Sequence, residues 1–179
     1  MSKRLSANVD VLKAAVRDVP DFPKPGIVFK DITPILGDAA LFRRAVALLA
    51  SRHVRGTVDK VAAIDARGFL FAGAVADRLR VGLVPIRKKG KLPYEKYEES
   101  YALEYGTATL TIHRDAFRPG DRAVLIDDLL ATGGTAAASA RLIEKAGGRV
   151  VEIHFLIELA FLKGRDKLAG YEVFAPIVF

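Results

Sequence analysis

The chain has 179 residues, enough for one domain with a complete core and too few for two ordinary domains. A hydrophobic fraction of 51% predicts a folded globule, and the absence of cysteine excludes disulfides and cysteine catalysis. The formal net charge of +7 is compatible with a nucleic-acid partner or with an anionic small substrate. Because the basic residues are spread along the chain without interleaved aromatic residues, we favour the small substrate and expect no nucleic-acid partner.

The sequence shows no sign of membrane insertion or export. No apolar run approaches the roughly 18 residues that a spanning helix needs. The basic start of the chain is not followed by the apolar segment of a secretory signal. We therefore expect a cytoplasmic protein without a membrane partner.

The first part of the chain is predicted to contain two helices separated by an irregular segment. Apolar positions within residues 8–17 are spaced for one face of a short helix, which Pro20 is expected to end. Several prolines and a glycine within residues 21–34 indicate a shaped loop. Asp38 is placed to cap a second helix that extends to about residue 52.

Two strand ends in the middle of the chain carry basic residues. The apolar run 61–64 is typical of a central parallel strand, and Arg67 and Gly68 follow it before a helix predicted over 69–79. A fixed cation beside a glycine suits a pyrophosphate, although a surface ion pair is the alternative. A strand over 81–86 then leads into the basic run 87–91, whose four cations repel one another unless a polyanion neutralises them or solvent separates them.

The next stretch is predicted to leave the core. Residues 93–100 are rich in charge and tyrosine, and the alternating segments 101–106 and 107–112 are typical of a hairpin. We interpret residues 92–112 as a long flexible excursion, a kind of loop that often serves as a lid. Glu104 lies in it, and an exposed glutamate is in most proteins only solvated.

The most informative stretch is residues 124–135. Apolar residues lead to Asp127 and Asp128, and the turn 131–135, rich in glycine and threonine, precedes a helix predicted over 136–145. Free N–H groups at a helix N-terminus suit a phosphate monoester, and two carboxylates can accept hydrogen bonds from the adjacent hydroxyls of a ribose. The pattern predicts a ribose 5-phosphate site, with an ordinary strand and capped helix as the alternative. It is not a Walker loop, because no Gly-Lys-Ser/Thr follows.

The remaining elements complete an alternating pattern. A glycine pair at 147–148 ends the helix, and a strand over 150–159, a helical turn over 164–168 and a last strand over 171–179 follow. This alternation predicts an α/β fold, with a parallel sheet, helices on both faces and ligands at the carboxyl ends of the strands. The histidines, His53, His113 and His154, are scattered and show no metal-ligand spacing.

Asp127 and Asp128 together with residues 131–135 resemble the phosphoribosyl pyrophosphate (PRPP) signature of the type I phosphoribosyltransferases. Segments 21–34, 66–69, 87–93 and 103–106 extend the resemblance over nearly the whole chain and are similar to adenine-specific members of that family. The resemblance implies a single domain over residues 1–179, with a parallel-sheet core, a small hood at about 1–34 and a hairpin lid at about 92–112. It also implies a non-proline cis peptide in the loop beside Ala66.

The activity implied is transfer of the 5-phosphoribosyl group from PRPP to adenine, which gives AMP and pyrophosphate in purine salvage. The implied cofactor is Mg²⁺, held mainly by oxygens of PRPP with no protein ligand certain, and the implied assembly is a homodimer. The residues expected to bind PRPP are Arg67, Arg87, Lys88, Lys91, Asp127, Asp128, Ala131, Thr132, Gly133, Gly134 and Thr135.

For adenine, the resemblance implies that Phe29 stacks on the base while main-chain groups at Val28 and Lys30 contact its edge. Family members commonly have arginine where Lys30 stands, so a planar guanidinium role would be lost here. Glu104 is implied as the catalytic acid or base. The rival interpretation is a regulator that senses the nucleotide and binds nucleic acid, but no helix-turn-helix is evident and the lid with Glu104 favours an enzyme.

Overall fold

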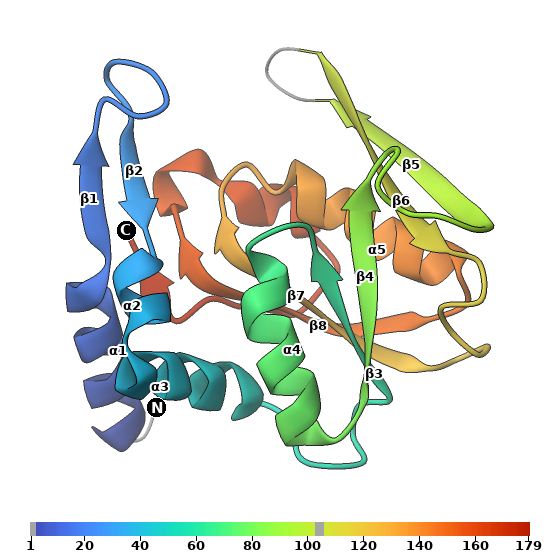
Figure 1. Ribbon diagram of the computed structural model, residues 1–179, viewed down its shortest axis with the longest axis horizontal. Coiled ribbons are helices and arrows are strands. Elements are labelled where there is room, and N and C mark those ends of the chain that lie inside the picture. The colour runs from blue at the N-terminus through green and yellow to red at the C-terminus, as the bar shows by residue number, and fades with distance from the viewer. Residues whose placement is uncertain (1–2, 103–105) are drawn as a thin grey trace. The chain divides into compact units, whose positions relative to one another are not determined.

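The computed structural model describes residues 3–102 and 106–179, and the chain divides into two compact units, Met1–Leu49 and Ala50–Phe179. Each unit is ordered around its own regular elements (Figure 1). The elements that begin in the first unit are α1 (Lys3–Ala15), β1 (Arg17–Pro20), β2 (Val28–Asp31), α2 (Thr33–Gly37) and α3 (Ala39–Ala50).

The proline-rich segment that was expected to be irregular contains one strand of a hairpin. Strand β1 pairs with β2 in antiparallel register, with Pro20 opposite Val28. The connecting turn has positive φ at Asp21 and Gly26, and the Gly26 N–H donates to Asp21 Oδ1 at 2.7 Å. The prediction that Pro20 ends a helix was wrong, because α1 already ends at Ala15 and the proline occupies the end of a short strand, where no N–H is needed.

The predicted cap of the second helix is confirmed. Asp38 Oδ1 accepts hydrogen bonds from the N–H groups of Ala40 and Leu41 at 2.7 and 2.9 Å, which satisfies two of the donors that the first turn of α3 leaves open. The helix ends at Ala50, two residues before the predicted end.

The second unit is built on a sheet whose central strands are parallel. Among the described residues the strand order is β10-β8-β7-β3-β4-β6-β5, with β9 also paired to β8. Among the described strands of this sheet, the β4–β6 and β6–β5 pairs are antiparallel and the other pairs are parallel. The strands are β3 (Lys60–Ile64), β4 (Gly82–Lys88), β5 (Lys96–Ala102), β6 (Thr107–His113), β7 (Arg122–Leu130), β8 (Arg149–Glu158), β9 (Val173–Phe174) and β10 (Ile177–Val178).

Helices α4 (Gly68–Leu79) and α5 (Gly134–Lys145) cover opposite faces of this sheet. Helix α4 connects β3 to β4, and α5 connects β7 to β8, so the two crossovers run in opposite directions across the strand order. Since such crossovers are right-handed, the helices must lie on opposite sides. Figure 1 shows this arrangement. The prediction of an α/β fold with helices on both faces is thereby confirmed.

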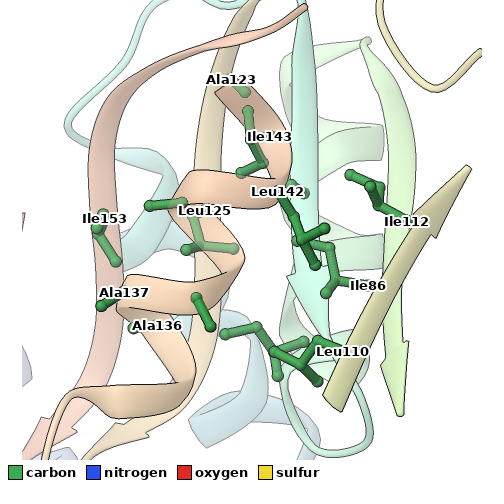
Figure 2. Close-up of a cluster of buried hydrophobic side chains, with 14 of the residues drawn as sticks. Ile86, Leu110, Ile112, Ala123, Leu125, Ala136, Ala137, Leu142, Ile143 and Ile153 are labelled. Carbon is green, nitrogen blue, oxygen red and sulfur yellow. The ribbon is translucent and has the colours of Figure 1, made fainter. Parts of the chain in front are cut away.

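The core under α5 shows why its alanine-rich sequence forms a helix at this position. Ala136, Ala137, Leu142 and Ile143 face the sheet and pack against side chains of β3, β4, β6, β7 and β8 (Figure 2). Small residues at the start of the helix allow it to approach β7 and β8 closely.

Two residues of β6, Leu110 and Ile112, belong to this core. The expectation that residues 92–112 leave the core was therefore wrong for β6, which extends the sheet beyond β4. Strand β5 is also held, because Arg141 Nε of α5 lies 2.7 Å from Glu99 Oε1. Hydrophobic residues spaced for a hairpin do not reveal whether that hairpin joins a larger sheet.

The C-terminal part of the chain largely follows the prediction. Gly147 has a φ of +92° after α5, and the expected helical turn is the 3₁₀ helix Gly164–Leu168, which follows another at Ala160–Leu162. The last predicted strand is divided into β9 and β10, with Pro176 between them. Within the described ranges, none of the helices has the length and apolar character required to cross a bilayer.

Candidate active site

A cavity of about 340 Å³ opens at the carboxyl ends of β3, β4 and β7. It brings together residues that sequence analysis had assigned to PRPP from separate segments. These are Arg67, Lys88, Asp127, Asp128 and Thr135. A larger cavity of about 510 Å³ lies at the amino-terminal ends of the strands, but none of these residues lines it, so chemistry and not size identifies the site.

A second, smaller pocket of about 80 Å³ adjoins the first and shares Asp127 and Thr135 with it. Ala131, Thr132 and Gly133 also line it. Helix α5 begins directly after Gly133, so the open N–H groups of its first turn and the positive end of its dipole lie at this pocket. This geometry suits a single phosphate group, as the sequence predicted.

Gly133 has a close neighbour that the sequence did not reveal. It adopts a φ of +79°, and a Cβ placed on it would overlap the carbonyl oxygen of Gly164. A Cβ on Gly164 would in turn overlap the carbonyl oxygen of Ala131. The loop of residues 131–133 therefore rests directly on the backbone of residue 164. Sequence analysis assigned that glycine only to a helical turn, because nothing local marks a contact between segments this far apart.

Asp127 and Asp128 lie near the carboxyl end of β7, three and two residues before its last residue, Leu130. Burial raises the pKa of Asp127 well above its usual range, and the neighbouring Asp128 carboxylate raises it further. Burial also raises the pKa of Asp128, while the Arg67 guanidinium opposes that rise, with Nε 2.7 Å from Asp128 Oδ2. Two carboxyl groups that are costly to ionise indicate a site adapted to strong hydrogen-bond donors or to a cation.

The loop between β3 and α4 packs against this acidic pair. Its Asp65–Ala66 peptide bond is cis, as the family resemblance implied. A Cβ on Gly68 would lie only 2.9 Å from Asp127 Oδ1, so glycine is required for the loop to approach β7 this closely. The Arg67 guanidinium is thereby held over the carboxylates.

The basic segment of residues 87–91, which begins in the last two residues of β4, is partly neutralised by the protein itself. Arg87 Nε lies 3.2 Å from Asp65 Oδ2, and its Nη1 donates to the Lys91 carbonyl at 2.7 Å. Lys89 Nζ lies 2.9 Å from Glu98 Oε2. Of the four cations, Lys88 is the one that lines the cavity in the described structure, so Arg87 and Lys91 lie beside the predicted site rather than in it.

Tyr101 on β5 is a further residue of the site that sequence analysis did not identify. It lines the same cavity, and the Thr135 hydroxyl donates to its Oη at 3.0 Å. A Cβ on Gly134 would lie 3.3 Å from the Tyr101 ring. This contact joins β5 to the start of α5, and only the folded sheet brings these two segments together.

The residues assigned to adenine lie on β2 in the first unit. The Phe29 ring packs edge-on against Phe22, with centroids 5.2 Å apart. Lys30 Nζ lies 2.7 Å from Asp18 Oδ1 across the hairpin. The lysine side chain is thus engaged by its own hairpin, and Val28 is exposed. Glu104, the predicted acid or base, lies outside the described residues.

Comparison with known proteins identifies related sequences and structures. Residues 35–174 match the family model of the phosphoribosyl transferase domain. An adenine phosphoribosyltransferase of Acidothermus cellulolyticus is 57% identical over 159 residues, which cover 89% of this chain and 90% of the relative.

Two crystal structures of adenine phosphoribosyltransferases have the same fold. That from Thermoanaerobacter pseudethanolicus is 52% identical with a TM-score of 0.91, over 96% of this chain and 99% of the other. That from Saccharomyces cerevisiae, complexed with adenine and an imino-altritol bisphosphate, is 36% identical with a TM-score of 0.89, over 96% and 99% of the two chains. The chain therefore belongs to the phosphoribosyltransferase family, among its adenine phosphoribosyltransferases.

Proposed function

We propose that this chain transfers the 5-phosphoribosyl group of PRPP to adenine, giving AMP and pyrophosphate in purine salvage. The observation that carries the proposal is that the acidic pair and the phosphate pocket adjoin and share Asp127 and Thr135. A single ligand that carries a diol close to a phosphate group can bind to the acidic pair and to the phosphate pocket at the same time. The relatives described above also support the proposal, because they are named adenine phosphoribosyltransferases and this chain matches them over nearly their full length.

PRPP binding divides between the two pockets. The 5′-phosphate occupies the pocket of residues 131–135, where it accepts hydrogen bonds from N–H groups, from the Thr132 hydroxyl and from the Thr135 hydroxyl, which turns from Tyr101 Oη to the phosphate. The ribose 2′- and 3′-hydroxyls donate to Asp127 and Asp128. Bound donors favour the ionised carboxylates, so ligand binding offsets the cost of burying them.

The pyrophosphate lies toward the β3–α4 loop and the end of β4. Bond cleavage at the anomeric carbon leaves negative charge on pyrophosphate and gives the ribose oxocarbenium character. Arg67 and Lys88 neutralise the leaving group. Arg87 reaches it after releasing Asp65 and the Lys91 carbonyl, and the Lys91 side chain reaches it from beside the cavity. Preorganised cations at the developing charge are expected to contribute the largest share of rate acceleration.

The donor set fits a Mg²⁺ ion held mainly by PRPP. Two ionisable carboxylates line the cavity, and Mg²⁺ prefers oxygen ligands, keeps several waters and binds substrate phosphates. Asp127 and Asp128 would hold it directly or through water. Bound there, the ion would supply further charge neutralisation of pyrophosphate.

Adenine is proposed to stack on Phe29, with main-chain groups at Val28 and Lys30 at its edge. Stacking of a base on an aromatic ring contributes about 1–3 kcal/mol and does not distinguish purines, so the edge contacts must select adenine. Glu104 donates a proton to the imidazole ring of adenine, or accepts one from it, as a general acid or general base. The predicted lid, apart from β6, which is fixed in the sheet, is proposed to close over the site and to prevent water from hydrolysing PRPP.

The proposal includes a single-domain homodimer that works in the cytoplasm. A highly charged sugar phosphate does not cross a bilayer unaided, so enzyme and substrate must share a compartment. Light scattering of the purified chain tests the assembly, and a monomer at micromolar concentration would contradict it.

The function is tested by incubating the protein with PRPP, Mg²⁺ and one purine base at a time, followed by assay of pyrophosphate release. We expect release with adenine and little with hypoxanthine, guanine or xanthine. Preference for another base would contradict the role of residues 28–30, and release with none would favour a regulator that only binds the nucleotide.

Replacing Glu104 with alanine is expected to lower kcat by about a hundredfold, within the usual contribution of general acid–base catalysis, with little change in PRPP affinity. Glu98→Ala is the matched control, since Glu98 is a glutamate of the same hairpin that pairs with Lys89 outside the cavity. Equal kcat values for the two variants would mean that Glu104 is only solvated and has no catalytic role.

A further inference from the structure

Two of the three histidines meet in the folded second unit, although sequence spacing gave no sign of it. His53 lies in the loop that follows α3, while Glu152 and His154 lie two positions apart on β8 and so project from the same face. His53 Nε2 lies 3.0 Å from Glu152 Oε2, and His154 Nε2 lies 2.9 Å from the same oxygen. One potential ligand atom from each residue falls within 4.8 Å of the others.

The cluster is enclosed by protein. His154 is fully buried and Glu152 is 5% exposed. The two imidazole rings stack with centroids 5.2 Å apart, and Phe174 packs against His154 at 5.3 Å. Arg52 donates from Nε to Glu152 Oε1 at 2.9 Å, so one carboxylate oxygen is engaged by arginine and the other faces the histidines.

In this cluster, the hydrogen bonds leave the buried nitrogen His53 Nε2 without a partner. His154 Nε2 has hydrogen-bond geometry toward Glu152. His53 Nε2 is equally close but is not aligned for a hydrogen bond, and it is a buried nitrogen without such a partner in the described structure. Buried polar atoms are normally satisfied, so a close but misaligned nitrogen requires an explanation.

We propose that His53 Nε2, His154 Nε2 and Glu152 Oε2 bind a divalent transition-metal ion of the zinc class. Two imidazoles and one carboxylate are an established zinc ligand set, with water at the fourth position. Metal–ligand bonds of about 2.0–2.2 Å imply ligand atoms separated by about 3.4 Å in a tetrahedron. The two nitrogen–oxygen separations have to widen by only a few tenths of an ångström.

Arg52 is the cation that faces the cluster and repels a metal ion. Because of this repulsion, we expect the cluster to bind only metal ions that have a high affinity for nitrogen ligands. His154 pairs in register with Ile126 and Glu152 with Val124, so the site lies alongside the buried part of β7 and not at the PRPP cavity. Its role is to fasten the loop of residues 51–59 to β8, independently of catalysis.

The test uses Zn²⁺ as ligand and Co²⁺ as its spectroscopic substitute, with the purified full-length protein. We expect one equivalent of Zn²⁺ by calorimetry and the visible absorption bands of tetrahedral Co²⁺. His53→Ala and Glu152→Gln should each weaken Zn²⁺ binding by more than about a hundredfold and remove the Co²⁺ bands, because loss of a supporting contact alone costs about 10–100-fold. Glu152→Gln retains side-chain shape should the alanine variant fold poorly.

His113→Ala is the matched control, because His113 is the remaining histidine and contacts the carbonyl of Pro93 on the other side of the sheet order. It should retain Zn²⁺ affinity, the Co²⁺ spectrum and any rise in melting temperature with Zn²⁺. Absence of the Co²⁺ bands in the wild type, or equal Zn²⁺ affinity in His53→Ala and His113→Ala, would overturn the proposal and leave a hydrogen-bonded cluster.

Discussion

Replacing Asp127 and Asp128 together with asparagine is expected to lower kcat/KM for PRPP by about a hundred- to ten-thousandfold. Each ribose hydroxyl then loses a charged acceptor, and a hydrogen bond to a charged group contributes about 1.5–3 kcal/mol. The fold should persist, because the amide has the same shape and its oxygen can still accept the Asp128 N–H bond that Asp127 Oδ1 now accepts at 2.9 Å.

Steady-state kinetics with varied PRPP measure the expected loss of kcat/KM. Circular dichroism measures whether the fold persists. Asp166→Asn is the matched control, since it makes the same chemical change at an exposed position of the 3₁₀ helix Gly164–Leu168. Kinetics of the double variant equal to those of this control would refute the role of the acidic pair in diol binding.

The acidic pair should also make the ligand-free protein less stable as pH rises. The pKa of Asp127 is raised in the folded state, mainly by burial and then by Asp128, so folding favours its protonated form. Below the ordinary value of 3.8 the group is protonated in both states and has no effect on the balance. As pH rises from there through the folded-state pKa, the unfolded chain releases the proton first, and stability falls.

Asp127→Asn removes this titration, so the single variant should be more stable than the wild type near neutral pH. Urea midpoints at pH 4.5 and pH 8 provide the measurement, with an advantage of the variant that grows with pH. Saturating PRPP should stabilise the wild type and reduce or reverse the difference. A difference that stays constant with pH would mean that Asp127 ionises normally in the fold.

That the acidic pair and the turn of residues 131–135 line adjoining pockets was predictable because their geometry is local. About ten residues hold the strand end, the carboxylates, the turn and the helix start, and each is marked by residue type. Arg67 was found by the same logic, since carboxyl ends of parallel strands meet at one edge of the sheet. Alternation of strands and helices then gave the fold class.

What sequence analysis missed depends on contacts between distant segments. Gly164 supports Gly133, and Tyr101 meets Thr135, only once the sheet and α5 have formed. His53 reaches β8 for the same reason. Proline content concealed the β1–β2 hairpin, because prolines at the end and in the turn of a hairpin look like those of a loop. Periodicity likewise could not reveal that β6 joins the main sheet.

Gly133→Ala is the single substitution expected to disturb the phosphate pocket most. An alanine at φ +79° is strained by about 1–2 kcal/mol, and its Cβ also overlaps the Gly164 carbonyl oxygen. Because backbone on both sides must move, we expect a total loss of about 2–4 kcal/mol and a melting temperature lower by roughly 5–15 °C. A loop displaced by about 1 Å should lower kcat/KM for PRPP by about a hundredfold.

Substitution of two further glycines distinguishes the effect of backbone strain from the effect of steric crowding. Gly120 has a φ of +84°, and no atom lies within 4 Å of the position that a Cβ would take, so Gly120→Ala should cost only the strain and leave activity unchanged. Gly164→Ala crowds the Ala131 carbonyl from the opposite side of the contact, without a positive φ at residue 164. It should reproduce the loss of PRPP affinity that Gly133→Ala causes.

Thermal melts and kinetics with varied PRPP, carried out on all three variants, decide between the two causes. If crowding dominates, Gly133→Ala and Gly164→Ala form one group and Gly120→Ala resembles the wild type in activity. If Gly133→Ala behaves like Gly120→Ala, the loop yields to an added methyl group, and the support from residue 164 has no part in holding the phosphate. The first outcome would place residue 164 among the determinants of PRPP binding although it does not line the phosphate pocket.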